Sequence, residues 1–339
     1  MIKQALFPLF CSCILSIQAQ ESSLPYITTW QGNRQAAVCY TFDDACPNQF
    51  KTAIPILDRY KAPATFFVSQ AFNPDWNVLT AISRNGHEIA SHTQTHCNLT
   101  DEVAETEYAQ SNRLIESKTG NKVYTLAYPF CNAPSDSITA RYYLGARICS
   151  GQIEKSTPDN FMRISSIVVG KESGFTTGES LVRLFRNTLQ QNGCCILLIH
   201  EIDNGPGYSP LSSQALEESL EYIHNNPVFW VTTFKDYICY AKEKEAAQIK
   251  EIERSEKQIS LTVTDNLPDS VYKTPVTVSY PLPEDWSDAS INCRKKAIES
   301  RTEGNRILFD IIPDSGIVTI NKKYILNFLS GIKKAPKSD

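Results

Sequence analysis

The chain has 339 residues, with 33 Lys and Arg against 37 Asp and Glu, which gives a formal net charge of −4. Hydrophobic residues make up 42% of it and charged residues 21%. This is enough apolar material for a core and excludes a disordered chain or a disulfide-only miniprotein. A nucleic-acid or anionic-membrane surface would need a concentrated basic face, which the net negative charge argues against.

The first nineteen residues have the layout of a secretory signal peptide. Lys3 precedes an uncharged apolar run over residues 5–17, and small or polar residues surround Ala19. This run is shorter than the roughly 20 residues that span a bilayer, and we expect no transmembrane segment elsewhere. We therefore predict cleavage after Ala19 and a secreted or periplasmic protein.

From residue 36 to 236, short apolar runs alternate with longer amphipathic ones. The short runs are rich in β-branched and aromatic residues, which is typical of buried strands. They cover residues 36–41, 64–69, 88–91, 125–130, 164–169, 195–199 and 229–233, with helices expected over 47–60, 75–85, 100–119, 134–144, 178–191 and 211–225. About seven strand–helix units predict an α/β fold, with a parallel sheet closed or nearly closed into a barrel. Functional residues then belong at the carboxyl ends of the strands.

A different composition follows the predicted barrel. Alternating Lys and Glu predict a helix with a solvated face from residue 236 to 257. Beyond it, apolar and polar residues alternate over 259–264, 276–280, 306–311 and 317–320, which is typical of antiparallel strands. We expect a barrel domain over residues 20–240, a helical connector over 241–257, and a small all-β sandwich-like module with a polar tail over 258–339.

Two adjacent carboxylates follow the first predicted strand, in Tyr40-Thr-Phe-Asp-Asp-Ala45. An alternating strand directs Asp43 and Asp44 to different sides, so one can bind a metal while the other stays free as a base. Such a pair alone is more often a feature of a turn or a helix cap. The functional interpretation therefore depends on the other strand ends.

Two histidines follow the predicted strand over residues 88–91. His92 and His96 are four residues apart, which places them on one face of a helical turn, where they can share a divalent ion. With Asp44 they form a two-histidine, one-carboxylate set with open positions, as in a catalytic rather than a structural metal site. His87 and His224 have no comparable setting, and we interpret them as surface or strand-edge residues.

Two further predicted strands end in residues suited to chemistry. Thr125-Leu-Ala-Tyr-Pro-Phe-Cys131 stops at a proline, and Ile196-Leu-Leu-Ile-His200 ends in a histidine. A histidine there is either a packed core residue or a general acid that reaches the same end of the barrel as the candidate metal ligands. The neighbouring metal set favours the general acid.

In this order, these segments resemble the polysaccharide deacetylase family, the nodulation-protein B homology domain of carbohydrate esterase family 4. The resemblance covers roughly residues 34–240 and rests on Thr-Phe-Asp-Asp, the two histidines, Tyr-Pro-Phe and Leu-x-His. It implies a distorted barrel of alternating strands and helices. It also implies a hydrolase that uses a divalent metal, usually zinc, to remove acetyl groups from N-acetylglucosamine units or, in some members, from acetylated xylan.

The resemblance assigns a role to each motif residue. Asp43 would be the general base, and His200 would protonate the leaving amine or alkoxide. The backbone N–H of Tyr128 would help to hold the oxyanion, and Leu198 would line the pocket for the acetyl methyl group. The metal would be held by Asp44, His92 and His96.

Two departures from the family pattern affect this site. Many members pair an arginine, two residues before the proline of the third motif, with the catalytic aspartate, but this chain has Ala127 there. Arg163 is the candidate substitute, and an ordinary surface cation is the equally weighted alternative. The family's Asp-x-x-Asp-aromatic motif, which orients the acid histidine, is missing between residues 131 and 165. Asp203 is close to His200 in sequence, but the partner of His200 stays unassigned.

Cysteines stand beside three of the motifs. Three of them should surround the end of the barrel that carries the motifs: Cys46, Cys97 and Cys131. We expect a disulfide between two of these three, with thiolate ligation of the metal as the alternative. Other cysteines lie in apolar patterns typical of small buried hydrophobes; these are Cys39, Cys149, Cys194 and Cys239.

The expected substrate is an acetylated polysaccharide or oligosaccharide, with zinc as the expected metal. Three alternatives stay open: an O-deacetylase of the acetyl-xylan type, a hydrolase of other C–N or ester bonds, and a degenerate barrel that binds glycans without catalysis. Trp76 and Trp230 are candidates for stacking on a sugar, although buried aromatics are the commoner outcome.

Overall fold

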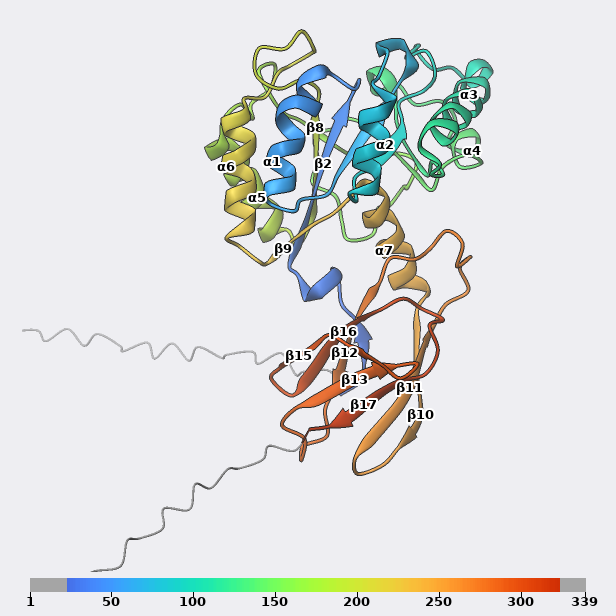
Figure 1. The fold of residues 1–339 in the computed structure, drawn as a ribbon, viewed down its shortest axis with the longest axis vertical. Helices are drawn as coiled ribbons and strands as arrows, with labels where there is room; N and C mark the ends of the chain where they lie inside the picture. Colours follow the sequence, from blue (N-terminus) through green and yellow to red (C-terminus); the bar gives the residue numbers. More distant parts are fainter. Residues whose placement is uncertain (1–22, 324–339) are drawn as a thin grey trace, which may run out of the picture.

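The computed structural model describes residues 23–323. The predicted signal peptide and the polar tail from Lys333 lie outside these residues. The chain forms a barrel domain and a β module, joined by helix α7 (Phe234–Ala246) (Figure 1). No helix in the described part of the chain is long and apolar enough to cross a membrane.

The named strands of the barrel domain all pair in parallel. In spatial order its strands are β6 (Gly145–Arg147), β5 (Thr125–Ala127), β4 (Glu88–Ser91), β3 (Ala64–Val68), β2 (Ala36–Asp43), β8 (Cys194–Ile199) and β7 (Ile167–Val168), and β9 (Phe229–Val231) pairs with β2. A parallel bridge between Arg147 and Ile164 links β6 to the segment just before β7. The two edges of the sheet therefore approach each other, and the predicted barrel is confirmed.

The central strands are buried on both faces. Every residue of β2, β3 and β8 is buried, as expected for a parallel sheet that is covered on both sides. Side chains such as Tyr40 and Phe66 pack beneath the surrounding helices, whereas Cys39, Phe67 and Ile196 alternate with them and fill the other face. This double burial produces the continuous apolar runs in the sequence.

Helices cover the outside of this sheet (Figure 1). They are α1 (Ile54–Arg59), α2 (Trp76–Arg84), α3 (Asp101–Thr119), α4 (Asp136–Thr139), α5 (Gly178–Gln190) and α6 (Ser213–His224), with short turns η1 (Gln31–Asn33), η2 (Gln49–Ala53), η3 (Gln70–Phe72) and η4 (Pro129–Cys131). Gly120 ends α3 with a φ of 75°, a left-handed conformation that favours glycine. Helix α4 is much shorter than predicted, because the chain turns after it to enter β6.

The β module is a sandwich of two antiparallel sheets. One contains β1 (Tyr26–Ile27), β12 (Val276–Pro281), β16 (Arg306–Ile311) and β15 (Ser300–Glu303), and the other contains β10 (Gln248–Arg254), β11 (Gln258–Thr264), β17 (Val318–Lys322), β13 (Ala289–Cys293) and β14 (Lys296–Ile298). Leu261 from one sheet and Phe309 from the other lie in the same hydrophobic core. The predicted all-β module is therefore confirmed.

Two predicted domain boundaries need correction. Helix α7 ends at Ala246, and the rest of the predicted helical connector forms the edge strand β10, which pairs antiparallel with β11. Its charged side chains suit a sheet edge exposed to solvent. At the other end of the chain, β1 pairs with β12. The segment before the barrel is thus part of the module.

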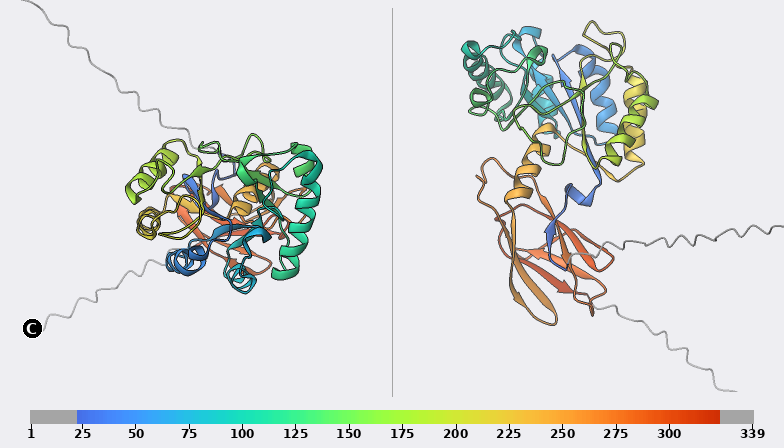
Figure 2. Two further views of the ribbon diagram at one scale, coloured as in Figure 1. Left: turned by 90° about the horizontal axis from the view of Figure 1, so that it is seen from above. Right: turned by 180° about the vertical axis from the view of Figure 1, so that it is seen from behind.

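The module lies at the amino ends of the barrel strands, and the arrowhead of β2 points away from it (Figures 1 and 2). The Tyr240 hydroxyl donates to the Thr28 carbonyl at 2.9 Å, and the Gly32 N–H donates to the Thr277 hydroxyl at 2.6 Å. The ring of Trp230 packs on that of Tyr240, with 5.2 Å between centroids. The carboxyl ends of the strands therefore open on the side opposite the module.

Candidate active site

The strand ends that carry the sequence motifs meet at the open end of the barrel. Asp43 is the last residue of β2, His92 follows β4 directly and His200 follows β8. Because parallel neighbouring strands all end at the same edge, side chains far apart in the sequence converge there. This convergence forms the candidate active site.

Asp44, His92 and His96 lie close enough to hold one ion. The Nε2 atoms of His92 and His96 are each 3.5 Å from Oδ1 of Asp44. One ligand atom from each residue lies within 4.8 Å of the other two. The structure thus brings together the three residues that the sequence predicted as ligands.

The donor set fits a divalent cation. Oδ1 of Asp44 is buried and has no hydrogen-bond partner among the described residues. Burial, together with the Asp43 carboxylate, raises the pKa of Asp44 to about 7, so its ionised form needs a positive partner. His92 donates its Nδ1–H to the Ala127 carbonyl at 2.7 Å, which leaves Nε2 unprotonated toward the site. Burial lowers the pKa of His92 to about 4 and also lowers that of His96, which keeps both rings neutral.

The histidines do not converge on a helical turn, as their spacing suggested. Residues 92–100 are not helical, and Thr93 and His96 have φ values of 65° and 54°. Asp44 likewise has a φ of 71°. Left-handed backbone at non-glycine residues is strained and clusters at functional sites. Two of the three candidate ligands are held in this conformation.

Asp43 lies beside the metal set and is paired with Arg147. Nη2 of Arg147 donates to Oδ1 of Asp43, and both side chains are buried. The guanidinium also lies 4.8 Å from the centre of the Phe67 ring. Burial alone would raise the pKa of Asp43, but Arg147, together with the nearby histidines in their protonated form, outweighs this effect, so the pKa is lowered. Asp43 is therefore ionised and able to accept a proton.

The prediction that Arg163 replaces the family arginine is wrong. Arg163 is exposed, and its Nε donates to Asp136 at 2.7 Å. Arg147 takes that place because β6, a strand missed in the sequence, ends at this residue beside β5. The only local signal in Gly145-Ala-Arg147 is a cation at a strand end.

His200 also reaches the site, from the end of β8. Its Nδ1 is buried and makes no hydrogen bond with the described residues, while its ring packs edge-on against Tyr208 at 5.0 Å. Asp203 instead accepts the N–H of Ser213 at 2.7 Å at the start of α6. Burial and the positive charge of Arg147 lower the pKa of His200, and Asp43 opposes this shift.

The predicted oxyanion donor is engaged elsewhere. The N–H of Tyr128 donates to the Arg147 carbonyl at 3.2 Å, since the pairing of β5 with β6 continues to this residue. The N–H of Phe130 makes no hydrogen bond within the described part of the chain, and its ring lies 4.8 Å from that of His96. Leu198 is buried two residues before His200, and therefore on the same face of β8.

A disulfide joins Cys131 to Cys149, so the bridge predicted within Cys46, Cys97 and Cys131 is wrong. Cys149 follows β6 closely, and the pairing of β6 with β5 brings it beside η4. Cys46 and Cys97 are free thiols. The group of candidate metal ligands among the described residues contains no cysteine.

Exposed aromatic rings surround the site. Phe72, Phe130 and Tyr208 are 42%, 68% and 55% exposed, and each ring contacts His96 or His200. Phe72 and Tyr208 also line a cavity of about 650 Å³ beside Asp44. The tryptophans proposed for sugar stacking lie elsewhere: Trp76 begins α2, and Trp230 packs on Tyr240 next to the module.

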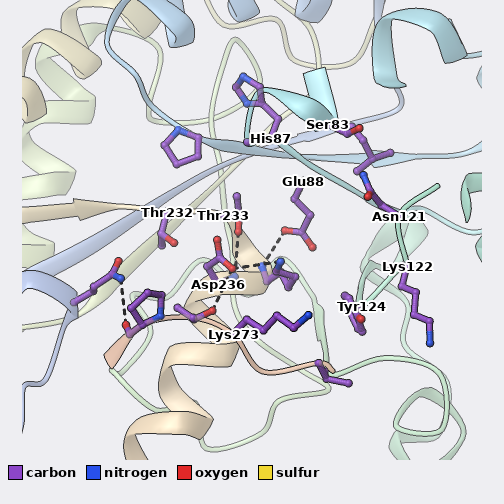
Figure 3. A pocket seen from close by; sticks show the side chains of 18 of the residues that line it. Ser83, His87, Glu88, Asn121, Lys122, Tyr124, Thr232, Thr233, Asp236 and Lys273 are labelled. Atoms are coloured by element: carbon purple, nitrogen blue, oxygen red, sulfur yellow. Dashed lines mark hydrogen bonds and ion pairs between the residues drawn. The ribbon is translucent and has the colours of Figure 1, made fainter. Parts of the chain in front are cut away.

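A second cavity, of about 830 Å³, lies at the opposite end of the sheet, between the barrel and the module (Figure 3). Most of its side chains are polar, and Glu88 in it already accepts hydrogen bonds from Thr65, Thr125 and the Lys235 N–H. His87 lines it and is buried, with Nδ1 accepting the Ala64 N–H at 3.1 Å. Of the two positions expected for His87, the surface one is therefore wrong, whereas His87 does stand at the edge of a strand, directly before β4. Because these polar groups already have hydrogen-bond partners, we interpret this cavity as part of the contact between the barrel and the module.

Comparison with known proteins decides the family. Residues 31–149 match a family model described as polysaccharide deacetylase. These residues belong to the polysaccharide deacetylase family. A crystal structure from Mycobacterium smegmatis, provisionally described as a polysaccharide deacetylase, covers 68% of this chain and 98% of its own, with a TM-score of 0.50 and 18% identity. That likeness confirms the barrel fold.

Two curated relatives match shares of the chain that differ widely in length. The chitooligosaccharide deacetylase of Rhizobium leguminosarum bv. phaseoli is 39% identical over 74 residues, which are 21% of this chain and 32% of that protein. A gellan lyase from a Bacillus species is 26% identical over 324 residues, which are 87% of this chain but 13% of that enzyme. This match is long enough to include part of the β module. The chain thus spans less than a third of one relative and about an eighth of the other.

Proposed function

We propose that the chain is a metal-dependent hydrolase that removes acetyl groups from a polysaccharide, most readily one that contains N-acetylglucosamine. The observation that carries this proposal is the arrangement around Asp44. Its Oδ1 is buried, has no partner among the described residues and lies 3.5 Å from Nε2 of both His92 and His96. An ionised carboxylate, Asp43, stands next to this set.

Zinc or another divalent ion held by Asp44, His92 and His96 would activate water and polarise the acetyl carbonyl. Asp43 accepts the proton of the attacking water, because its lowered pKa keeps it ionised. Arg147 fixes the orientation of Asp43 through their hydrogen bond. The base is thus held in place by a buried ion pair.

His200 stands at the end of β8 and would give its proton to the leaving nitrogen or oxygen. We assign the oxyanion contact to the N–H of Phe130 in place of Tyr128, since the Tyr128 N–H is already bonded. Leu198, on the same face of β8 as His200, would contact the acetyl methyl group.

The proposed substrate is an acetylated polysaccharide or oligosaccharide. The exposed rings of Phe72 and Tyr208 beside the cavity next to Asp44 suit the apolar faces of pyranose rings. The name of the chitooligosaccharide deacetylase relative supports a glycan built from acetylated amino sugars. The Cys131–Cys149 disulfide and the apolar N-terminal sequence support action outside the cytoplasm.

One observation favours an O-deacetylase as the second candidate. Nδ1 of His200 has no hydrogen-bond partner among the described residues, so the tautomer and orientation of the acid are not fixed by a carboxylate. An alkoxide leaves with less help from an acid than an amine does, so this site would handicap ester cleavage less than amide cleavage.

The experiment is acetate release from N-acetylglucosamine oligomers and from acetylated xylan, each with and without a chelator. We expect release that the chelator abolishes and added zinc restores, with the ratio of the two rates deciding between the candidates. Undiminished release by fully metal-depleted protein would contradict metal dependence. A metal-loaded protein that binds both glycans without releasing acetate would instead be the non-catalytic barrel.

A further inference from the structure

Gln49 connects the strand of the proposed base to the strand of the proposed acid. It is fully buried at the start of η2. Its Nε2 donates to the carbonyl of Asp43 at 2.5 Å and also to the carbonyl of His200. One side-chain amide therefore contacts the backbone of both residues.

The chemistry of these contacts fixes the orientation of the amide. Both partners are carbonyl oxygens, which only accept, so the NH2 group must face them. An NH2 group has two N–H bonds, and each carbonyl takes one. Gln49 is therefore matched to this pair of acceptors.

The two hydrogen bonds of Gln49 lie just beyond the point where the pairing of β2 with β8 ends. The last paired residues of β2 and β8 are Phe42 and Ile199, so Asp43 and His200 are the next residue on each strand. Beyond this pair, the Gln49 amide bridges the two chains in place of ladder hydrogen bonds. The separation of Asp43 and His200 then depends on a side chain.

The oxygen of the same amide is in an unfavourable environment. Oε1 of Gln49 is buried and has no hydrogen-bond partner among the described residues. A buried polar atom without a partner destabilises a fold, and an apolar side chain of the same shape would avoid this penalty. Core packing alone does not account for a glutamine here, whereas the bridge does.

We infer that Gln49 is a positioning residue that sets the distance and orientation between the general base Asp43 and the general acid His200. This inference rests on the proposed deacetylase function. Small displacements of reacting groups reduce turnover strongly. Loss of the bridge should therefore lower turnover while leaving the metal ligands and the substrate contacts in place.

The test compares Gln49→Met, which has similar length and no donor, with Gln49→Asn, which has the donors but is one methylene shorter. Tyr40→Phe is the matched control, because Tyr40, like Gln49, is fully buried, and its hydroxyl links β2 to α6 through a hydrogen bond with Ser219 at 3.0 Å. On N-acetylglucosamine oligomers we expect kcat to fall roughly 10- to 100-fold in both Gln49 variants. KM and zinc content should stay unchanged, and Tyr40→Phe should keep the wild-type kcat.

A double-mutant cycle identifies the route of the effect. In a His200→Ala background, Gln49→Met should cost less than it does in the wild type, because the acid it positions is gone. Wild-type kcat in both Gln49 variants, or an equal loss in Tyr40→Phe, would overturn the inference. Full additivity with His200→Ala would also overturn the part that concerns the acid.

A readout independent of activity separates this inference from the proposed function. The side-chain NMR signals of His200 should shift or broaden in both Gln49 variants and not in Tyr40→Phe. If the wild-type protein releases no acetate, the proposed function fails, and these signals still decide whether Gln49 positions His200. Unchanged His200 signals in a folded Gln49→Asn protein would overturn the inference even if Gln49→Met does not fold.

Discussion

Arg147 donates a hydrogen bond to Asp43 across 104 positions of sequence. Both side chains are buried, and β6 and β2, which carry them, are separated in the sheet by β5, β4 and β3. The pair therefore spans the interior of the barrel. It holds the carboxylate ionised in a place where burial alone would protonate it.

Arg147→Met should reduce kcat/KM by roughly 10²-fold, because Asp43 loses its orientation. The Arg147 charge lowers the pKa of Asp43, so its removal raises that pKa. The acid limb of the pH profile should then move to higher pH. Breaking a buried ion pair should also lower the free energy of unfolding by about 3–5 kcal/mol, which denaturant titration measures.

Arg163→Met is the matched control. Arg163 is exposed and pairs with Asp136, so its replacement should change neither the pH profile nor the rate. A larger loss of activity in Arg163→Met than in Arg147→Met would show that the assignment of the arginine is reversed.

His92→Ala and His96→Ala should each lose bound zinc and activity together, since two remaining ligands hold a divalent ion poorly. Zinc content measured by atomic emission, beside acetate release, checks this. His224→Ala is the control, because His224 is exposed on α6 and contacts only the Tyr60 ring among the aromatic residues. Stoichiometric zinc in either of the first two variants would show that the ligand set is misread.

His200→Ala should depress activity on N-acetylglucosamine oligomers severely and spare an activated aryl acetate, whose phenolate leaves without a proton. The imidazolium deprotonates as pH rises, so the wild-type rate on the amide should fall on the alkaline side. Burial lowers the pKa of His200, so this fall begins at lower pH than for an exposed histidine. The variant should lack this limb.

Equal losses on the two substrates would mean that His200 supports the metal site or the fold instead. Near-equal rates of the wild-type protein on amide and ester sugars would separately count against the O-deacetylase alternative, which requires a clear preference for the ester.

Mass mapping of the unreduced protein should find Cys131 linked to Cys149, with Cys46 and Cys97 alkylatable after denaturation. The two cysteines are 18 residues apart, and closing a loop of this size stabilises a fold by about 3 kcal/mol. Cys149→Ala should lower the unfolding free energy by that order. A Cys46–Cys97 link would contradict the structure and restore the pairing expected from the motifs.

The strands that carry the main motifs could be predicted because they are buried on both faces. β4 has the bounds that the sequence indicated, and β2 extends the predicted run by two residues to Asp43. Each ends in a polar motif, so the parallel order of the sheet brings Asp44, His92 and His200 together without further information.

Strand β6 could not be predicted, and two errors follow from it. Gly145-Ala-Arg147 has no hydrophobic period, and it is a strand only because β5 and the segment at Ile164 pair with it. Arg147 and Cys149 both depend on this strand for their positions. Without β6, the sequence offers Arg163 as the partner of Asp43 and the cysteines beside the motifs as partners in a disulfide.

Strand β10 shows the same limit in the module. Residues 248–254 contain good helix formers, yet they pair with β11 through a bulge between Glu251 and Glu253. Pairing with a neighbouring strand outweighs local helix propensity here. Gln49 was missed for a related reason, since nothing in its sequence context indicates that it reaches two strand ends.

The most direct test of the proposed site is a comparison of zinc content and acetate release in Asp43→Asn and Asp44→Asn. Asp43→Asn should keep its zinc and lose roughly 10²–10⁴ in rate, because it removes the base and not a ligand. Asp44→Asn should lose both zinc and activity. The opposite pattern, an empty site in Asp43→Asn and a full one in Asp44→Asn, would contradict the assignment of base and ligand.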